Sequence, residues 1–492
     1  MLAGSTGKHI ARAGRLGSGP ALGPQPFTTA MRTEIDAQAH GARGDGCTLN
    51  TRALQAAIDA AALQRAVLRV GPGVYLTGAL FLKSGMTLQL DRGATLLGSR
   101  DLADYPLLPT RVAGIEMRWP AALVNVYGEQ DVALVGEGCI DGDGQVFWDR
   151  YWALRATYEP RGLRWASDYD CQRPRLIQVF ESARVRIAGE GQGLLLRRSG
   201  FWTLHLCYSE DVSVERVTIR NNDEARGPST DGIDIDSSRR VTIRHADIAV
   251  NDDALCLKAG RDADGLRVAR PCEDITISDC TVREGAAGLT FGSETSGGLR
   301  RITAERIDVH APVPVGLLFK SAPTRGGFVQ DVSISDLTLH DVPVALRATM
   351  NWNPAYSQAQ IPESELHDAP LHWRTMAQPV PREQGRTRVE GVRLQRLTAR
   401  GAEVAFEVDA TAEVPLRRFH FQAMDIEATR GGHVQDALAW QFDEACRLQL
   451  GEPIRAGASC QLDGLAPAHW QVDTALKRRD VSDRTMAEQD VL

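Results

Sequence analysis

The chain has 492 residues, 43% of them hydrophobic, and a formal net charge of -7 at pH 7. Its 56 Lys and Arg residues are interspersed with 63 Asp and Glu residues, so the sequence has no basic stripe of the kind that binds nucleic acid. No stretch approaches the roughly 20 apolar residues of a membrane span. We therefore expect a soluble protein that binds neither nucleic acid nor a membrane.

The nine cysteines are odd in number and scattered, with no Cys-x-x-Cys pair and no histidines at zinc-site spacing. This pattern is typical of small buried apolar side chains. We expect no metal site and no cofactor.

The N-terminal stretch, residues 1–32, is rich in Gly and Pro and has no apolar segment of about 7 to 15 residues after Lys8, Arg12 and Arg15. It is expected to be a disordered tail, or a stretch ahead of a true start at Met31. Because no signal peptide is visible, a cytoplasmic location is favoured. A periplasmic or secreted location stays open if the start lies elsewhere.

A short helix is predicted after Asn50, which can act as its N-cap. Leu54, Ala57, Ile58 and Ala61 follow at helical spacing and share one face. Such a helix is expected to close one end of a larger structure.

A short sequence motif, here called a phrase, recurs along the chain. In it, apolar and polar positions alternate after a charged residue or glycine. Its first apolar positions are spaced by 27 to 34 residues, with one double interval, which is a solenoid signal. The phrases begin at Asp211, Arg240, Asp274, Arg301, Asp331, Gly391 and Arg418.

The alternation within each phrase is strand-like, and almost no helical pattern lies between phrases, which excludes a βαβ sheet. A propeller blade needs about 40 residues, longer than most of the intervals. The sequence therefore predicts an all-β fold, a single right-handed parallel β-helix over residues 33–430, with an extension over 431–492. Residues 345–388 interrupt the repeat and are predicted to form a long lateral loop, in which Trp352 or Trp373 could stack on a sugar.

The densest acidic cluster on the candidate strands contains Asp231, Asp252 and Asp253. Asp231 and Asp252 are 21 positions apart, close to one coil, so they are expected on neighbouring coils. Crowded carboxylates raise at least one pKa, and hydrolysis of a glycoside needs one protonated and one ionised group. Capping of turns and binding of calcium are the two other interpretations of this cluster.

At these residues the chain resembles glycoside hydrolase family 28, the polygalacturonases and their relatives. Ser229-Thr-Asp231 matches the family's Asn-Thr-Asp motif except at its first residue, and Asp252-Asp253 matches its Asp-Asp motif. The resemblance implies that Asp252 is the general acid of an inverting hydrolysis and that Asp231 and Asp253 hold the attacking water. It extends over about residues 35–430 and includes the segments Gly41-Ala-Arg-Gly-Asp-Gly46, Leu82-Lys-Ser-Gly85, Ile140-Asp-Gly-Asp-Gly144, Trp202-Thr-Leu-His205 and Gly292-Ser-Glu-Thr-Ser-Gly-Gly298.

Two departures from the family pattern bear on the substrate. The Gly-His-Gly motif falls on Gly285-Ala-Ala-Gly288, without a histidine, and the Arg-Ile-Lys motif falls on Leu318-Phe-Lys320, without the arginine. Lys320 is expected to bind a sugar carboxylate as a point charge, and Arg325 to replace the missing guanidinium. His205 is expected near the site.

The leading prediction is a polygalacturonase-like hydrolase that acts on pectic poly- or oligosaccharides, from the chain end because the lateral loop blocks part of the groove. A rhamnogalacturonan hydrolase or rhamnosidase of the same family remains an alternative, since Leu318 replaces the arginine. A β-helix polysaccharide lyase and a non-catalytic carbohydrate-binding solenoid are alternatives of other classes. The sequence does not predict an oligomeric state.

Overall fold

The computed structural model describes residues 33–222 and 226–476. The tail predicted for residues 1–32 lies outside the described residues, as does the end of the predicted extension, residues 477–492. Five of the nine cysteines are buried, as expected. Within the described ranges, no helix combines the length and apolar character needed to cross a membrane.

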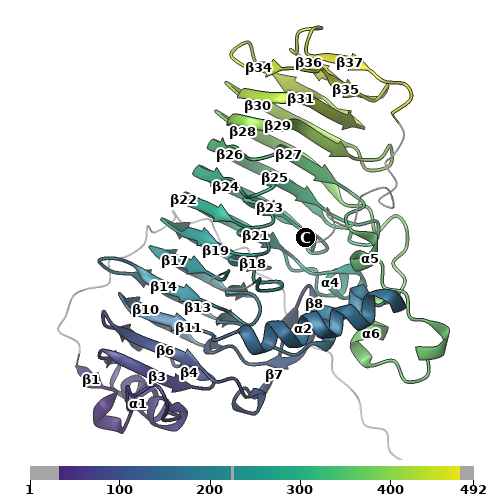
Figure 1. The fold of residues 1–492 in the computed structure, drawn as a ribbon. Helices are drawn as coiled ribbons and strands as arrows, with labels where there is room; N and C mark the ends of the chain where they lie inside the picture. The colour runs from purple at the N-terminus through teal and green to yellow at the C-terminus, as the bar shows by residue number, and fades with distance from the viewer. Residues whose placement is uncertain (1–32, 223–225, 477–492) are drawn as a thin grey trace, which may run out of the picture. The chain divides into compact units, whose positions relative to one another are not determined.

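The strands stack into three parallel ladders, to each of which a coil of the chain contributes in turn, and this arrangement is the predicted right-handed parallel β-helix (Figure 1). The first ladder contains β1 (Glu34–Asp36), β2 (Val67–Val70), β5 (Thr87–Leu90), β10 (Gln130–Gly136), β13 (Ala183–Gly189), β16 (Glu210–Glu215), β19 (Arg239–Arg244), β22 (Cys272–Glu284), β24 (Leu299–His310), β26 (Phe328–His340), β28 (Arg388–Gln395), β30 (Leu416–Gln422), β32 (Ala437–Leu438), β33 (Trp440–Phe442) and β36 (Leu462–Asp463).

Long strands such as β22 turn from the first ladder into the second. The second ladder adds β3 (Gly73–Thr77), β6 (Ala94–Gly98), β11 (Cys139–Asp141), β14 (Leu194–Arg197), β17 (Val217–Arg220), β20 (Asp247–Ala249), β29 (Thr398–Asp409), β31 (Asp425–Gln435) and β34 (Arg447–Leu450). The third ladder, into which β29 and β31 continue, adds β4 (Leu80–Leu82), β9 (Val124–Tyr127), β12 (Ile177–Phe180), β15 (Leu204–Cys207), β18 (Ile233–Asp236), β21 (Leu255–Lys258), β23 (Leu289–Phe291), β25 (Val315–Lys320), β27 (Val344–Thr349), β35 (Ile454–Ala456) and β37 (Trp470–Val472).

The predicted repeat positions lie in register in the first ladder. Each pairs directly with the next, and their side chains form one buried column inside the coils. The double interval between Val332 and Val392 is the point at which the lateral loop leaves the solenoid. The column runs through Val212, Val241, Ile275, Ile302, Val332, Val392 and Phe419.

The residue before each of these positions adopts the left-handed conformation that turns the corner of the coil. Asp and Arg occupy it at φ between 53° and 59°, and Gly391 takes the same place at φ 69°. Stacked corners pair their charges, as Arg240 does with Asp211 at 2.7 Å. These side chains are 46% and 42% exposed, so each such pair contributes about 1 kcal/mol or less.

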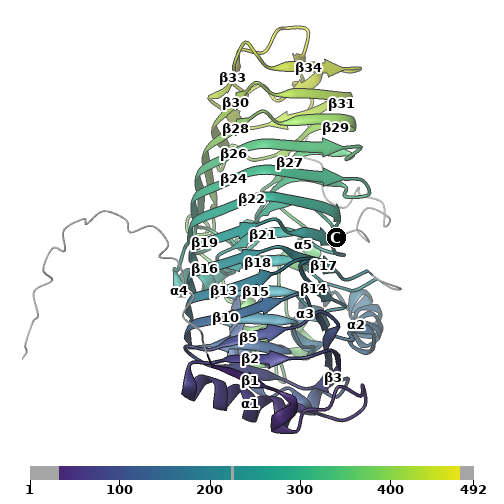
Figure 2. The same cartoon turned by 90° about the vertical axis from the view of Figure 1, so that its left-hand side faces the viewer.

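Helix α1 (Thr51–Gln64) covers the end of the stack next to β1 (Figure 2). Its four predicted apolar residues are all buried, which confirms the predicted face. Asn50 does not cap the helix with its side chain. Its amide instead joins backbone groups of Arg43 and Thr48, which fixes the preceding turn.

Several lateral segments leave the coils and pack together beside the third ladder (Figure 1). Most of them contribute to a second apolar core, in which the ring centroids of Trp373 and Trp165 are 5.1 Å apart. Trp373 is therefore a packing residue and not a platform for sugar. The segments are the antiparallel hairpin β7 (Leu107–Val112) and β8 (Ile115–Pro120), α2 (Gln145–Tyr158), α3 (Ser167–Asp170), α4 (Asp262–Val268), α5 (Pro354–Ser357) and α6 (Leu371–Met376), and short 3-10 turns lie at Gln38–His40, Leu102–Asp104, Glu159–Arg161, Arg164–Ala166 and Glu363–Glu365.

The solenoid continues beyond residue 430, into the stretch that the sequence predicted as a C-terminal extension over 431–492. Strands β33 to β37 pair in parallel with the preceding coils as far as Val472. The repeat is harder to recognise there because these strands are only two to four residues long.

Candidate active site

The three candidate catalytic carboxylates lie on the turns that lead into β18 and β21 of the third ladder. Because these strands pair in parallel, the turns lie side by side, and the amide of Gly232 donates to the carbonyl of Asp253 at 2.9 Å. Asp231 thus lies opposite Asp253, not opposite Asp252. One carboxylate oxygen of Asp231 is within 4.8 Å of one of Asp253.

Asp253 is the carboxylate that its surroundings keep ionised. Lys320, at the end of β25, donates to it at 2.8 Å, and the Thr290 hydroxyl donates at 3.0 Å. Burial opposes the charge, but attraction to Lys320 and Lys258 outweighs burial and lowers the pKa of Asp253. This residue suits the role of general base.

The pKa of Asp252 is shifted in the opposite direction. Burial and the neighbouring Asp253 carboxylate raise the pKa of Asp252 above its ordinary value. Its side chain also accepts a hydrogen bond from the amide of Asp253 at 2.9 Å, which fixes its orientation. A half-buried carboxyl that keeps its proton to a higher pH suits the role of general acid.

Asp231 belongs to a buried group of charges around Lys258. The Lys258 ammonium lies 3.3 Å from Asp231, 3.5 Å from Asp234 and 3.6 Å from Glu294. Burial, with repulsion from Asp234 and Asp252, raises the pKa of Asp231 well above its ordinary value. Burial also raises the pKa of Asp234, to about 7. In the free site Asp231 and Asp234 therefore hold protons more tightly than Asp253 does.

These side chains line one cavity on the outer face of the third ladder. Its walls come from the hairpin β7–β8, the segment around α3 and the lateral loop, so four parts of the chain meet here. The Nζ atom of Lys320 lies 4.3 Å from the ring centroid of Trp352, and the Nζ atom of Lys258 lies 4.8 Å from that of Trp202. The lining residues are Ala113, Arg164, Asp168, Phe201, Trp202, Ser229, Asp231, Asp252, Asp253, Lys258, Ser293, Glu294, Lys320, Trp352, Asn353 and Tyr356.

Lys320 reaches the cavity as expected, but its charge is already paired with Asp253. Arg325 and His205 are fully buried and are absent from the cavity lining. Arg325 pairs with Asp262 and donates to the carbonyl of Ser293. The geometry gives no support to the prediction that Arg325 and His205 bind substrate.

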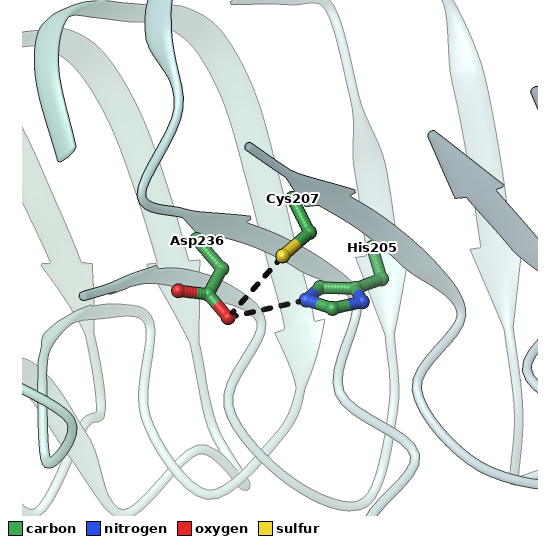
Figure 3. Close-up of side chains that lie close together, drawn as sticks. All are labelled: His205, Cys207 and Asp236. Atoms are coloured by element: carbon green, nitrogen blue, oxygen red, sulfur yellow. Dashed lines mark hydrogen bonds and ion pairs between the residues drawn. The ribbon is translucent and has the colours of Figure 1, made fainter. Parts of the chain in front are cut away.

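His205 instead belongs to a buried cluster with Cys207 and Asp236 (Figure 3). Burial lowers the pKa of His205 to about 4, so the ring is neutral at pH 7. Asp236 is 3.4 Å from the ring and 2.8 Å from the Arg111 guanidinium. Because Arg111 already neutralises the carboxylate, the cluster does not fit a metal cation.

The three candidate catalytic carboxylates also fit calcium poorly. Lys258 and Lys320 place two ammonium groups beside the oxygens that a calcium ion would need. The neighbouring thiol of Cys256 has a pKa raised well above its ordinary value by burial, so it is a hydrogen-bond donor and not a thiolate ligand.

Both departures from the family motifs fall in one small apolar cluster. Ala287 and Leu318 pack with Val315, Val344 and Val404, and all five are buried. The position of the family's arginine is thus closed to a charged group of the substrate.

Three lining residues that matter for the charge of the cavity escaped the sequence predictions. Lys258 and Glu294 lie within segments that the sequence singled out, but nothing in their spacing distinguishes them from surface charges. Arg164 lies in an irregular stretch without periodicity. Only the contacts of the folded chain identify them.

The chain matches the model of "Glycosyl hydrolases family 28" over residues 82–362, more than half of its length. It is 32% identical to a probable polygalacturonase of Vitis vinifera over 323 residues, covering 63% of this chain and 62% of the relative. It is 29% identical to an exo-poly-alpha-D-galacturonosidase of Dickeya chrysanthemi, covering 68% of this chain and 61% of the relative. The chain thus aligns with somewhat less than two thirds of the length of these relatives.

Two solved structures share the fold. The family 28 exopolygalacturonase of Yersinia enterocolitica aligns with a TM-score of 0.72 at 21% identity, over 89% of this chain and 80% of that one. The hyperthermoactive exopolygalacturonase of Thermotoga maritima aligns with a TM-score of 0.64 at 22% identity, over 88% and 92%. The family match confirms the resemblance seen in the sequence. This chain belongs to glycoside hydrolase family 28.

Proposed function

We propose that the protein is an inverting, exo-acting glycoside hydrolase of pectin-type poly- or oligosaccharides. The observation that carries the proposal is the pair of opposite pKa shifts on two neighbouring carboxyl groups that line one cavity: the pKa of Asp252 is raised and that of Asp253 is lowered. Environments that separate two carboxyl pKa values assign one group as acid and the other as base. Family membership supports the same chemistry.

In the proposed reaction Asp252 donates its proton to the glycosidic oxygen as the bond to the anomeric carbon breaks. Asp253 takes a proton from a water that attacks the same carbon from the opposite face. Asp231 faces Asp253 across at most 4.8 Å, a gap that one water can bridge with hydrogen bonds to both. Attack by this water would invert the anomeric configuration.

The exo mode is supported by the walls of the cavity. Cleavage within a polymer needs a groove open at both ends, whereas here Ala113, Arg164 and Trp352 come from three lateral segments around one cavity. Such a cavity favours the last sugar of a chain. The Dickeya chrysanthemi relative and the two solved structures, all three named as exo-acting, are consistent with this mode.

A second candidate is a rhamnogalacturonan hydrolase or rhamnosidase. It is favoured by one observation: Leu318, in place of the family's arginine, is buried in an apolar cluster. The substrate would then be neutral at the cleaved bond.

The test is product analysis by mass spectrometry and a reducing-end assay, with polygalacturonan, rhamnogalacturonan and oligomers of each. We expect saturated products released one unit at a time, and loss of this activity in Asp252→Asn. Asp336→Asn, which removes a surface carboxylate paired with Arg396, is the matched control. Unsaturated, ultraviolet-absorbing products would identify a lyase instead. No turnover of any pectic glycan by the wild type would overturn the substrate assignment.

A further inference from the structure

Glu294 is a cavity residue to which the proposed reaction gives no role. It lies on the turn after β23 and lines the cavity, and its side chain is only 4% exposed. Its Oε2 atom is buried without a hydrogen-bond partner among the described residues. Lys258 neutralises this oxygen from 3.6 Å but does not donate a hydrogen bond to it. Because buried carboxylate oxygens are costly to leave without a hydrogen bond, an oxygen in this position is suited to a ligand that donates to it.

Lys258 completes the arrangement. Its ammonium lies 3.6 Å from the carboxylate of Glu294 and 3.3 Å from that of Asp231, so one charged group lies between Glu294 and the catalytic carboxylates. A hydroxyl can donate to a carboxylate and accept from an ammonium at the same time. The pair Glu294–Lys258 thus presents both partners that a sugar hydroxyl needs.

Two features restrict what the pair can bind. Trp202, 4.8 Å from Lys258, also lines the cavity and offers an apolar face against which the C–H face of a sugar can pack. The Glu294 carboxylate repels another carboxylate. The part of the sugar at this position is therefore a hydroxylated edge and not the acid group of a uronate.

We propose that Glu294, with Lys258, binds a free hydroxyl of the terminal sugar and so selects unmodified non-reducing chain ends. The inference rests on the proposed exo-hydrolase function and names a residue that determines its specificity. Glu294→Gln replaces the charged carboxylate by a neutral amide, whose oxygen accepts a weaker hydrogen bond from a hydroxyl. Glu294→Ala removes the acceptor altogether. A hydrogen bond to a charged group is worth about 10- to 100-fold in binding.

The experiment compares trigalacturonate that has an ordinary non-reducing end with the same oligomer that has a 4,5-unsaturated end, which lacks the hydroxyl at C4. We expect the wild type to prefer the ordinary end, and Glu294→Ala to lose about 10- to 100-fold in kcat/KM on that substrate with little further loss on the unsaturated one. KM should change more than kcat. Glu390→Gln, a carboxylate paired with Arg418 outside the cavity, is the matched control.

The possible failures are distinguishable. If the wild type cleaves both oligomers and Glu294→Ala keeps the wild-type ratio between them, the role of Glu294 is wrong and the hydrolase function stands. If kcat alone falls, equally on both oligomers, Glu294 acts on the catalytic carboxylates and not on a hydroxyl. If the wild type cleaves neither oligomer, and calorimetry with Asp252→Asn detects no binding of either, both proposals are wrong.

Discussion

Lys320 is the residue that contributes most to lowering the pKa of Asp253. Its ammonium is buried, lies 2.8 Å from Asp253 and is held over the ring of Trp352. A cation at this distance both fixes the carboxylate and stabilises its ionised form. In this protein the lysine of the family motif therefore pairs directly with Asp253, the proposed general base.

Replacement of Lys320 by Met should shift the acidic limb of the pH profile. The pKa of Asp253 is lowered in the wild type, so loss of the ammonium raises it, and the base becomes protonated at a higher pH. We expect kcat/KM to fall by about 100-fold or more, with the steepest loss at low pH. The measurement is kcat/KM against pH. Arg396→Met, at a surface pair with Asp336, should leave the profile unchanged, and an unshifted acidic limb in Lys320→Met would contradict this role.

The sequence predicted the carboxylates and Lys320 because they belong to motifs of fixed composition on neighbouring coils. It did not predict that Asp231 faces Asp253, because the register depends on the length of each turn. The geometry gives no support to the prediction that Arg325 replaces the family's guanidinium, because its side chain is buried away from the cavity lining. The guanidinium pairs with Asp262, a partner 63 positions away that only the folded chain brings near.

At the scale of the element, the corners of the coils explain why the phrase recurs. Each phrase begins where the chain must adopt φ near 55°, which costs Asp and Arg a small backbone strain. Ion pairs between residues at neighbouring corners, such as Arg301 with Asp274, accompany this conformation. The apolar positions that follow then fall on the inside of the coil. The period seen in the sequence is thus the length of one turn around the solenoid.

Gly391 tests this account of the corner. An added Cβ would meet nothing closer than 3.7 Å, so any cost of substitution comes from φ 69° and not from a clash. We expect Gly391→Val to destabilise the protein by about 1 to 2 kcal/mol and Gly391→Asn to be nearly neutral, since Asn tolerates the left-handed region. The midpoint of urea unfolding measures both. Equal midpoints for the Val and Asn variants would contradict the account.

The lateral loop is held in place by Trp373 on α6. This side chain packs against Trp165 and donates from its indole N–H to Asp170 at 3.0 Å. Trp373→Ala should lower the free energy of unfolding by about 3 to 5 kcal/mol and increase the mobility of the loop that carries Trp352. We expect longer products from a polymeric substrate and faster proteolysis within residues 350–387. Leu371→Ala, at a residue of the same helix that is 80% exposed, should behave as wild type.

At the scale of the whole molecule, the solenoid was predictable and the cavity was not. Seven phrases in the sequence correspond to seven residues in one column, because identical stacking repeats the same local pattern. The walls of the cavity come from segments without a period, such as the hairpin β7–β8 and the stretch around Arg164. Their positions follow from a second apolar core that assembles residues between Val112 and Met376.

In the proposed mechanism Asp252 supplies a proton to the leaving oxygen while Asp253 activates water. The most direct measurement compares kcat/KM of Asp252→Asn and Asp253→Asn on a natural oligomer and on an activated aryl glycoside of the same sugar, whose leaving group needs no proton. We predict that Asp252→Asn loses about 100- to 10,000-fold on the oligomer but far less on the aryl glycoside, while Asp253→Asn loses comparably on both. Equal losses of Asp252→Asn on the two substrates would contradict its role as the general acid.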